Sequence, residues 1–250
     1  MGKISVIGIG PGGLDEMTPR ACKAIEGAEV VAGYNTYIKL IEELLRGKKI
    51  IGRAMMQEVE RCQLAIEETL TGKNVAVVSS GDSGVYGMAG LVVEMILNLP
   101  EDKQPQFEVI AGVSAVNAAA AILGAPLMND FAVISLSDLM TPFDVIKQRV
   151  RAAAQGDFVI ALYNPKSKRR VTQLEDVQKI LLEYRKKNTP VGIVTNAGRE
   201  GESKIISTLE NFTREEINMF SLVLIGNSQT FIKAGFMLTP RGYKELGIRN

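Results

Sequence analysis

The chain of 250 residues has no histidine and only two cysteines, Cys22 and Cys62. Without histidine it has no Ser-His-Asp triad, no imidazole general base and no metal site with an imidazole ligand. Two isolated cysteines provide neither a disulfide framework nor a cysteine-rich metal centre, so we expect idle thiols in a reducing compartment. The chemistry must come from carboxylates, lysine, arginine, tyrosine, hydroxyls and backbone dipoles, and we expect the protein itself to bind no metal.

An excess of charge of one sign is also missing, because 29 lysines and arginines nearly balance 28 aspartates and glutamates and leave a net charge of +1. Such a chain has no basic field to hold a nucleic-acid backbone, so we expect no nucleic-acid partner. No apolar run approaches the roughly 20 residues that span a bilayer. The first residues lead straight into a short strand-like segment without the apolar stretch of a signal peptide. We therefore expect no membrane partner and predict a cytoplasmic protein.

Short β-branched segments alternate with segments of helical period, which predicts a layered α/β fold with a largely parallel sheet. The predicted strands cover 3–9, 29–32, 49–52, 74–79, 107–110, 131–136, 157–162, 191–195, 204–208 and 222–225. The predicted helices of the second half cover about 142–154, 171–186 and 213–218. A helical segment at 114–123 ends at the turn 124–126, so we predict two domains, 1–124 and 125–250.

The first glycine loop, 8–13, follows the first strand and satisfies the pattern G-x-G-x-x-G. In a dinucleotide site, a helix begins at these glycines and points its free amides at the pyrophosphate. Here the helix begins late, near Thr18, and Pro11 removes one amide donor. Asp15 and Glu16 would repel a pyrophosphate. Dinucleotide binding is therefore disfavoured, and the loop is either a ligand-free turn or a close-approach loop for another cofactor.

Two more glycine-rich loops, 80–87 and 111–115, follow predicted strands of the first half. Taken singly they prove little, because Asp82 could form a simple Asx-turn and Ser114 could only cap the next helix. The carboxyl ends of parallel strands, however, meet at one edge of a sheet. We therefore expect the three glycine loops to converge on a crevice of the kind in which open α/β sheets bind ligands.

A basic cluster opens the helix after the strand at 157–162. It comprises Lys166, Lys168, Arg169 and Arg170. Cations at a helix N-terminus oppose the helix dipole, which indicates an anionic ligand. A solvated run of charge explains the last three residues equally well, and Lys166, nearest the strand, is the better candidate for a ligand contact.

The chain resembles the tetrapyrrole methylase family in five ordered motifs: Gly8-Ile9-Gly10-Pro11-Gly12, Gly33-Tyr34, Ser80-Gly81-Asp82-Ser83-Gly84-Val85-Tyr86, Gly112-Val113-Ser114-Ala115 and Tyr163-Asn164-Pro165. The resemblance implies two α/β domains with the active site in the cleft between them, in a homodimer. It also implies S-adenosylmethionine as cofactor, S-adenosylhomocysteine as product and a tetrapyrrole as substrate.

Segments 124–142, 163–167 and 238–243 are similar to the branch of that family that methylates carbon 17 of a precorrin and contracts its ring in cobalamin biosynthesis. Asn129 stands where members of this branch commonly have a histidine. Any acid-base role of that histidine is therefore absent here. Both the cobalt-bearing and the metal-free, hydroxylated substrate remain candidates.

Carried over by motif, the resemblance implies a set of cofactor contacts. They are Gly10, Pro11, Gly81, Asp82, Val85, Tyr86, Ser114, Ala115, Leu162, Tyr163, Asn196, Ala197 and Ile225. An aspartate suits the ammonium and sulfonium of this cofactor. Arg53 and Lys166 are predicted to hold substrate carboxylates, while Asp15 and Tyr34 are candidate groups for assisting ring contraction.

Three alternatives remain beside carbon-17 methylation. A sister methylase would act at another carbon, or on a protein or RNA. An NAD-dependent dehydrogenase would use the first glycine loop for pyrophosphate. A non-catalytic module would bind the cofactor without turning it over. Methyl transfer itself depends mainly on placement in a dry site, so a protein without histidine can perform it.

Overall fold

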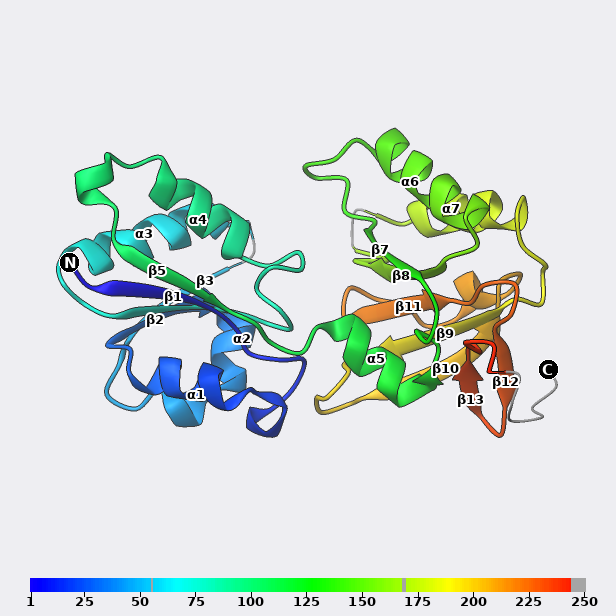
Figure 1. Cartoon of the computed structure of the whole chain (residues 1–250), viewed down its shortest axis with the longest axis horizontal. Coiled ribbons are helices and arrows are strands. Elements are labelled where there is room, and N and C mark those ends of the chain that lie inside the picture. The colour runs from blue at the N-terminus through cyan, green and yellow to red at the C-terminus, as the bar shows by residue number, and fades with distance from the viewer. Residues whose placement is uncertain (55, 168–169, 244–250) are drawn as a thin grey trace. The chain divides into compact units, whose positions relative to one another are not determined.

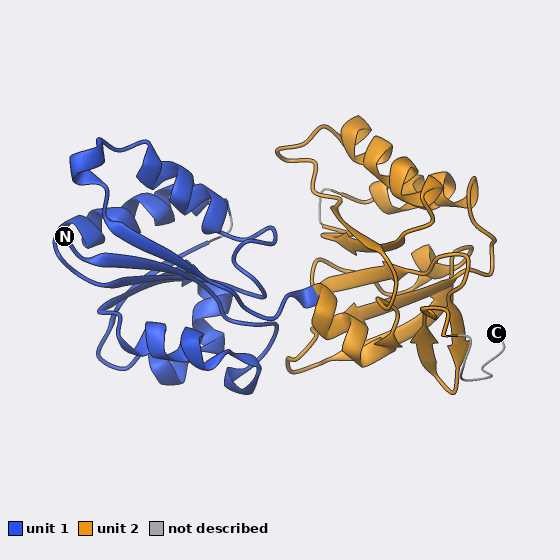
Figure 2. Ribbon diagram, in the orientation of Figure 1, with its two compact units in different colours: residues 1–115 blue, residues 116–250 orange. Residues whose placement is uncertain are grey.

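A computed structural model describes residues 1–54, 56–167 and 170–243 (Figure 1). The chain forms two compact units, Met1–Ala115 and Val116–Asn250 (Figure 2). The division falls at the first residue of α5 (Ala115–Leu123), one helix earlier than the predicted boundary at 124.

Helix α5 joins the second unit because it packs on the sheet of that unit. A Cβ built on Gly192 would lie only 2.4 Å from Cδ1 of Leu123, so the glycine makes room for the helix. The predicted linker is itself structured: Gly124–Ala125 forms strand β6, which pairs with β13 (Phe236–Leu238). A glycine-proline turn in the sequence therefore marks the end of a helix rather than the division between the units.

Unit 1 contains a fully parallel five-stranded sheet in the order β3-β2-β4-β1-β5. The strands are β1 (Lys3–Gly8), β2 (Val30–Tyr34), β3 (Lys49–Arg53), β4 (Val75–Ser79) and β5 (Gln106–Ile110). The central strand β4 is buried along its whole length, as expected for a parallel strand covered on both faces. The parallel sheet predicted for the first half is confirmed.

Helices cover both faces of this sheet (Figure 1). One face carries α1 (Pro19–Glu26) and α2 (Asn35–Leu40), and the other carries α3 (Glu58–Leu70) and α4 (Ala89–Leu97). Three 3-10 turns complete the unit: η1 (Leu14–Glu16), η2 (Glu42–Leu44) and η3 (Glu101–Lys103). The predicted start of α1 is confirmed, because Thr18 Oγ1 accepts a hydrogen bond from the Ala21 amide at 3.1 Å.

Glu108 forms an ion-pair cluster on the edge strand β5. Its carboxylate lies 2.7 Å from Lys3 Nζ and 3.0 Å from Arg20 Nη2, and it accepts a hydrogen bond from Ser5 Oγ at 2.9 Å. The hydrogen bond from Lys3, with those from Arg20 and Ser5, lowers the pKa of Glu108 from 4.5 to about 2 against the opposing effect of partial burial. The ionised carboxylate therefore stabilises the fold.

Replacing Glu108 by glutamine should lower the free energy of unfolding at neutral pH by about 1 kcal/mol, since solvent screens these partly exposed pairs. Because the folded pKa lies below the unfolded value, this contribution is complete above the unfolded pKa of 4.5 and is lost as the pH falls towards 2. Urea unfolding of both proteins between neutral pH and about pH 3 should show the difference narrowing at the acid end. A difference that stayed constant would contradict this account of Glu108.

Unit 2 contains a mixed five-stranded sheet in the order β10-β9-β11-β8-β7. The strands are β7 (Phe131–Ser135), β8 (Val159–Tyr163), β9 (Pro190–Thr195), β10 (Ser203–Thr208) and β11 (Ser221–Ile225). Only β7 and β8 are parallel; the other neighbours are antiparallel. The predicted parallel sheet is wrong for this half, because β10 turns back along β9 without a crossover helix and β11 lies antiparallel between β9 and β8.

Two helices, α6 (Phe143–Gln155) and α7 (Gln173–Leu182), pack on one face of this sheet and confirm two of the three predicted helices (Figure 1). The third, predicted at 213–218, is wrong: this region contains only the 3-10 turn η4 (Phe212–Arg214). Phe212 and Ile217 are both buried. Residues five apart point to different sides of a helix, so one helix through this segment would not bury both on the same face.

A small sheet in the order β12-β13-β6 completes unit 2. It joins β12 (Phe231–Lys233) and β13 as an antiparallel hairpin, and β6 runs parallel to β13. The sequence analysis did not predict these three short strands. None of the described helices has the length and apolar character that a membrane span requires.

Candidate functional site at the carboxyl edge of the unit 1 sheet

The unit 1 sheet has a topological switch point between its neighbouring strands β1 and β4. From β1 the chain passes through α1 on one face, whereas from β4 it passes through α4 on the opposite face, to the other end of the sheet. The connections that follow the two strands therefore run to opposite faces of the sheet. Open α/β sheets bind ligands at this point.

The three glycine loops meet there, as the sequence predicts, and they touch backbone to backbone. Gly10 and Gly81 exchange two hydrogen bonds, of 3.1 Å from the Gly10 amide and 2.7 Å from the Gly81 amide. A Cβ on Gly8 would lie 2.7 Å from the Gly112 nitrogen, and one on Gly112 would lie 2.3 Å from the Gly81 oxygen. These glycines are therefore required for the loops to pack, before any ligand is considered.

Asp82 links the second glycine loop to the third. Its Oδ1 accepts a hydrogen bond from the Gly84 amide at 2.8 Å, and its Oδ2 accepts one from the Gly112 amide at 3.0 Å. The bond to Gly84 is the Asx-turn that the sequence left open. Each carboxylate oxygen has a second acceptor position, so this structural role is compatible with an attraction for a cationic ligand.

Left-handed backbone recurs in the loops that the resemblance assigns to the cofactor. The φ angles are 54° at Tyr86, 52° at Asn164 and 53° at Asn196. Asparagine adopts this conformation readily, but tyrosine does not. The strain at Tyr86, a residue that is 55% exposed, is of the kind that accumulates at ligand-binding loops.

The remaining unit 1 candidates for the cofactor lie on the same three loops. Gly10 and Pro11 are buried in the first loop, and Val85 is half-buried in the second. Ser114 lies directly before the first residue of α5, Ala115. The structure therefore brings all of the predicted unit 1 cofactor residues to one edge of the sheet, and their contacts with a cofactor stay a prediction.

The two candidate groups for ring contraction lie apart from each other. Asp15 is exposed on η1, in the loop after β1. Tyr34 ends β2, with its ring 5.2 Å from that of Tyr37 in an edge-to-face arrangement. Because β4 separates β1 from β2 in the sheet, the two groups belong to separate parts of the edge. Neither is assigned a catalytic role by this geometry.

The two cations predicted to hold the substrate each contact a carboxylate. Arg53 Nε lies 3.1 Å from Glu60 Oε1, and Arg53 also donates to the Gly52 carbonyl at 3.0 Å. Lys166 Nζ lies 3.7 Å from Glu175 Oε1. The remaining members of the basic cluster are Lys168, Arg169 and Arg170.

Among them, Lys168 and Arg169 lie outside the described residues, and Arg170 is only 9% exposed. The interpretation of the cluster as a solvated charge run is therefore wrong for Arg170.

In unit 2 the structure separates the residues predicted to contact the adenosine. Tyr163 ends β8 and Asn196 directly follows β9 at the same edge, with Ala197 next along the chain. The Tyr163 hydroxyl accepts a hydrogen bond from the Val116 amide at 2.9 Å. Ile225 ends the antiparallel strand β11 and therefore lies at the opposite edge.

Both Ile225 and Leu162 are fully buried in the core of unit 2. Their burial is explained by packing alone. The antiparallel direction of β11, which the sequence did not predict, is the reason that Ile225 is displaced from Tyr163 and Asn196.

Arg61 is a buried cation at the carboxyl edge of unit 1 that the sequence analysis overlooked. Its side chain belongs to the buried stripe of α3, together with Cys62, Ala65, Ile66 and Thr69. An arginine in an otherwise small and apolar stripe was the available signal, because arginine is rarely fully buried without a partner.

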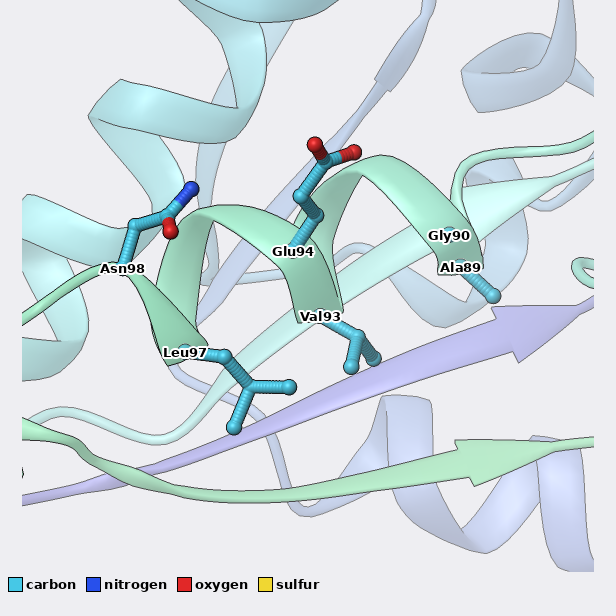
Figure 3. Close-up of a pocket in the computed structure, with 6 residues that line it drawn as sticks. All are labelled: Ala89, Gly90, Val93, Glu94, Leu97 and Asn98. Atoms are coloured by element: carbon cyan, nitrogen blue, oxygen red, sulfur yellow. The ribbon is translucent and has the colours of Figure 1, made fainter.

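A shallow hollow on the outer side of α4 contains none of the predicted site residues. It is lined by Ala89, Gly90, Val93, Glu94, Leu97 and Asn98. Val93 and Leu97 point to one side of the helix, and Glu94 and Asn98 point to the other (Figure 3). With a single ionisable side chain and no converging polar groups, it does not resemble a catalytic site.

Comparisons with known proteins agree with the family that the five sequence motifs indicate. The model of the tetrapyrrole (corrin/porphyrin) methylases matches residues 3–213. A probable cobalt-factor III C(17)-methyltransferase of Salmonella typhimurium is 48% identical, over 96% of this chain and 99% of that protein. A cobalt-factor III methyltransferase of Priestia megaterium is also 48% identical, but the matched 97% of this chain spans only 45% of that protein.

Among solved structures, the methyltransferase CobJ superposes with a TM-score of 0.89 at 34% identity, covering 96% of this chain and 100% of that one. The similarity in structure therefore extends over both units.

Proposed function

Because the chain belongs to the tetrapyrrole methylase family, we propose that it transfers the methyl group of S-adenosylmethionine to carbon 17 of a precorrin-type tetrapyrrole and contracts the ring, in cobalamin biosynthesis. The convergence of the three glycine loops at the switch point supports this proposal most directly. The names of the two relatives favour cobalt-factor III as the acceptor.

The loops of unit 1 suit this cofactor. When bound, it supplies an electrophilic methyl group: a substrate carbon donates the electron pair of the new bond, and the sulfonium keeps the electrons of the broken one as a thioether. Glycine backbone allows the ligand to approach the sheet edge closely. Asp82, with spare acceptor positions, attracts the positive charges of the cofactor. The protein has to hold the substrate carbon and the methyl group in attack geometry. Such positioning alone accelerates a reaction strongly and needs no general base.

Arg53 and Lys166 are proposed to orient the substrate through its carboxylates. Arg53 ends β3 and Lys166 lies in the loop after β8, and each contacts a glutamate that remains partly exposed. Exposed ion pairs are weak, so a multiply charged substrate can replace these glutamates at little cost. We propose further that the enzyme is a cytoplasmic homodimer, which rests on the resemblance and the composition.

Two alternatives differ in what the same edge would bind. A sister methylase would bind the same cofactor at the glycine loops but would methylate another carbon of the macrocycle. A dehydrogenase would need a helix beginning at the first glycine loop, but that loop leads into the acidic turn η1, with Asp15 and Glu16 in it. The geometry therefore favours a cationic cofactor over a pyrophosphate.

Calorimetric titration with S-adenosylhomocysteine and, separately, with NADH tests the choice of cofactor. We expect S-adenosylhomocysteine to bind with a dissociation constant in the micromolar range or below, typical of cofactor sites, and NADH not to bind. Acidic residues at the first loop repel the pyrophosphate, which is the physical reason for the difference. Binding of NADH alone would overturn the proposed function.

A further inference from the structure

Arg61 carries a positive charge that the described part of the chain leaves uncompensated. Its side chain is 3% exposed, and its Nε and Nη1 have no hydrogen-bond partner among the described residues. The neighbouring acids are engaged elsewhere: Glu58 accepts from the Met56 amide at 3.1 Å, and Glu60 pairs with Arg53. A buried unpaired guanidinium is costly, so its retention requires a reason.

The one hydrogen bond described for the guanidinium of Arg61 is weak. Its Nη2 lies 3.3 Å from the thioether sulfur of Met88, and a thioether is a poor acceptor. Burial raises the pKa of the Cys62 thiol to about 11, and the nearby charge of Arg61 lowers it in part. These surroundings are therefore poor in water. In such an environment an arginine binds an anion more strongly than it does in solvent.

The position of Arg61 connects it to the candidate site. It lies near the start of α3, which follows β3, and therefore at the same carboxyl edge as the glycine loops. Met88 directly follows the loop 80–87 and is fixed there by a hydrogen bond of 3.2 Å from its amide to Ser79 Oγ. The methionine side chain has three rotatable bonds and can turn away at small cost, which would open the guanidinium to a ligand at this edge.

We propose that Arg61 is the receptor for a ligand carboxylate, and that the Met88 thioether occupies the place of a carboxylate oxygen until the ligand binds. The inference rests on the proposed function, which supplies two sources of this chemistry. One is the amino-acid carboxylate of the cofactor, and the other is a side-chain carboxylate of the tetrapyrrole. A guanidinium with open donors forms short, charge-assisted bonds to either.

Paired ligands distinguish the two sources. S-adenosylhomocysteine has the amino-acid carboxylate, whereas 5′-methylthioadenosine is a nucleoside thioether without it. Dissociation constants of both, and of cobalt-factor III under anaerobic conditions, are measured for the wild type, Arg61→Met and Arg61→Lys. Arg185→Met is the matched control, because Arg185 is also a buried arginine but donates to the Gly226 and Phe158 carbonyls of unit 2.

We expect Arg61→Met to weaken one carboxylate ligand about 10- to 100-fold, the effect of losing a hydrogen bond to a charged group. If that ligand is S-adenosylhomocysteine, affinity for 5′-methylthioadenosine stays unchanged and the source is the cofactor. If it is cobalt-factor III, the source is the substrate. Arg61→Lys should recover part of the loss, and Arg185→Met should lower stability without discriminating between the ligands.

Equal affinities of the wild type and Arg61→Met for all three ligands would overturn the inference and leave the proposed function intact. A wild type that binds neither S-adenosylhomocysteine nor cobalt-factor III would overturn both. If Arg61→Met does not fold, Arg61→Gln removes the same charge while keeping a polar group in the buried position. The same comparison of ligands then decides.

Discussion

Replacing Gly112 by alanine is expected to weaken the binding of S-adenosylhomocysteine at least about 100-fold, a loss of about 2.7 kcal/mol. The added Cβ would lie 2.3 Å from the Gly81 oxygen and 2.6 Å from both the carbonyl carbon and the oxygen of Gly8. All of these neighbours are backbone atoms, at the end of the strand β1 or just after the strand β4. They cannot yield as a flexible side chain would, so the three loops must separate.

Calorimetry measures the affinity, and thermal unfolding shows whether the protein still folds. Overpacking of this kind costs about 1–3 kcal/mol, so a lower melting temperature is expected as well. Gly90→Ala is the matched control, because nothing lies within 4 Å of a Cβ at that position in α4. That variant should be slightly stabilised, as expected for alanine in a helix, and should bind normally. Normal binding by a folded Gly112→Ala protein would disprove the role given to the loops.

Reversing the charges of Arg53 and Lys166 together is expected to weaken the binding of cobalt-factor III about 10- to 100-fold while the affinity for S-adenosylhomocysteine stays within about threefold. Each substitution to glutamate removes an attraction for substrate carboxylates and adds a repulsion. It also places two carboxylates side by side, because Glu60 and Glu175 are the present partners. The effect should decrease as salt is added.

The control for this pair is Lys187→Glu. It breaks an ion pair of 2.8 Å with Glu210 that is likewise exposed, but which belongs to no predicted site. Absorbance titration of cobalt-factor III gives the affinities of all three proteins. If the double variant bound the tetrapyrrole as well as Lys187→Glu does, the substrate role of the two cations would be withdrawn.

The convergence of the glycine loops could be predicted because it depends on a short-range rule. Loops such as 8–13 and 80–87 each follow a strand, and parallel strands bring their carboxyl ends to one edge. The start of α1 was equally local, since Thr18 caps it within one turn. The sequence was sufficient to predict a structural feature when the residues that specify the feature lie within a few positions of it.

The second unit shows where such rules fail. The direction of β11 depends on its pairing with β8 and β9, which are distant along the chain, and nothing within β11 itself specifies that direction. Ile225 therefore lies at the opposite edge from Tyr163, and its contact with the cofactor stays a prediction. Arg61 was missed for a related reason, since its burial and its lack of a partner exist only after α3 has packed on the sheet.

The most direct test of the central claim is an anaerobic incubation with methyl-labelled S-adenosylmethionine and either cobalt-factor III or precorrin-3B, followed by mass spectrometry of the tetrapyrrole. The account predicts that one labelled methyl group is incorporated and that cobalt-factor III is the better acceptor. Tight binding of the cofactor without transfer to either tetrapyrrole would contradict carbon-17 methylation and would favour a sister methylase with a different acceptor.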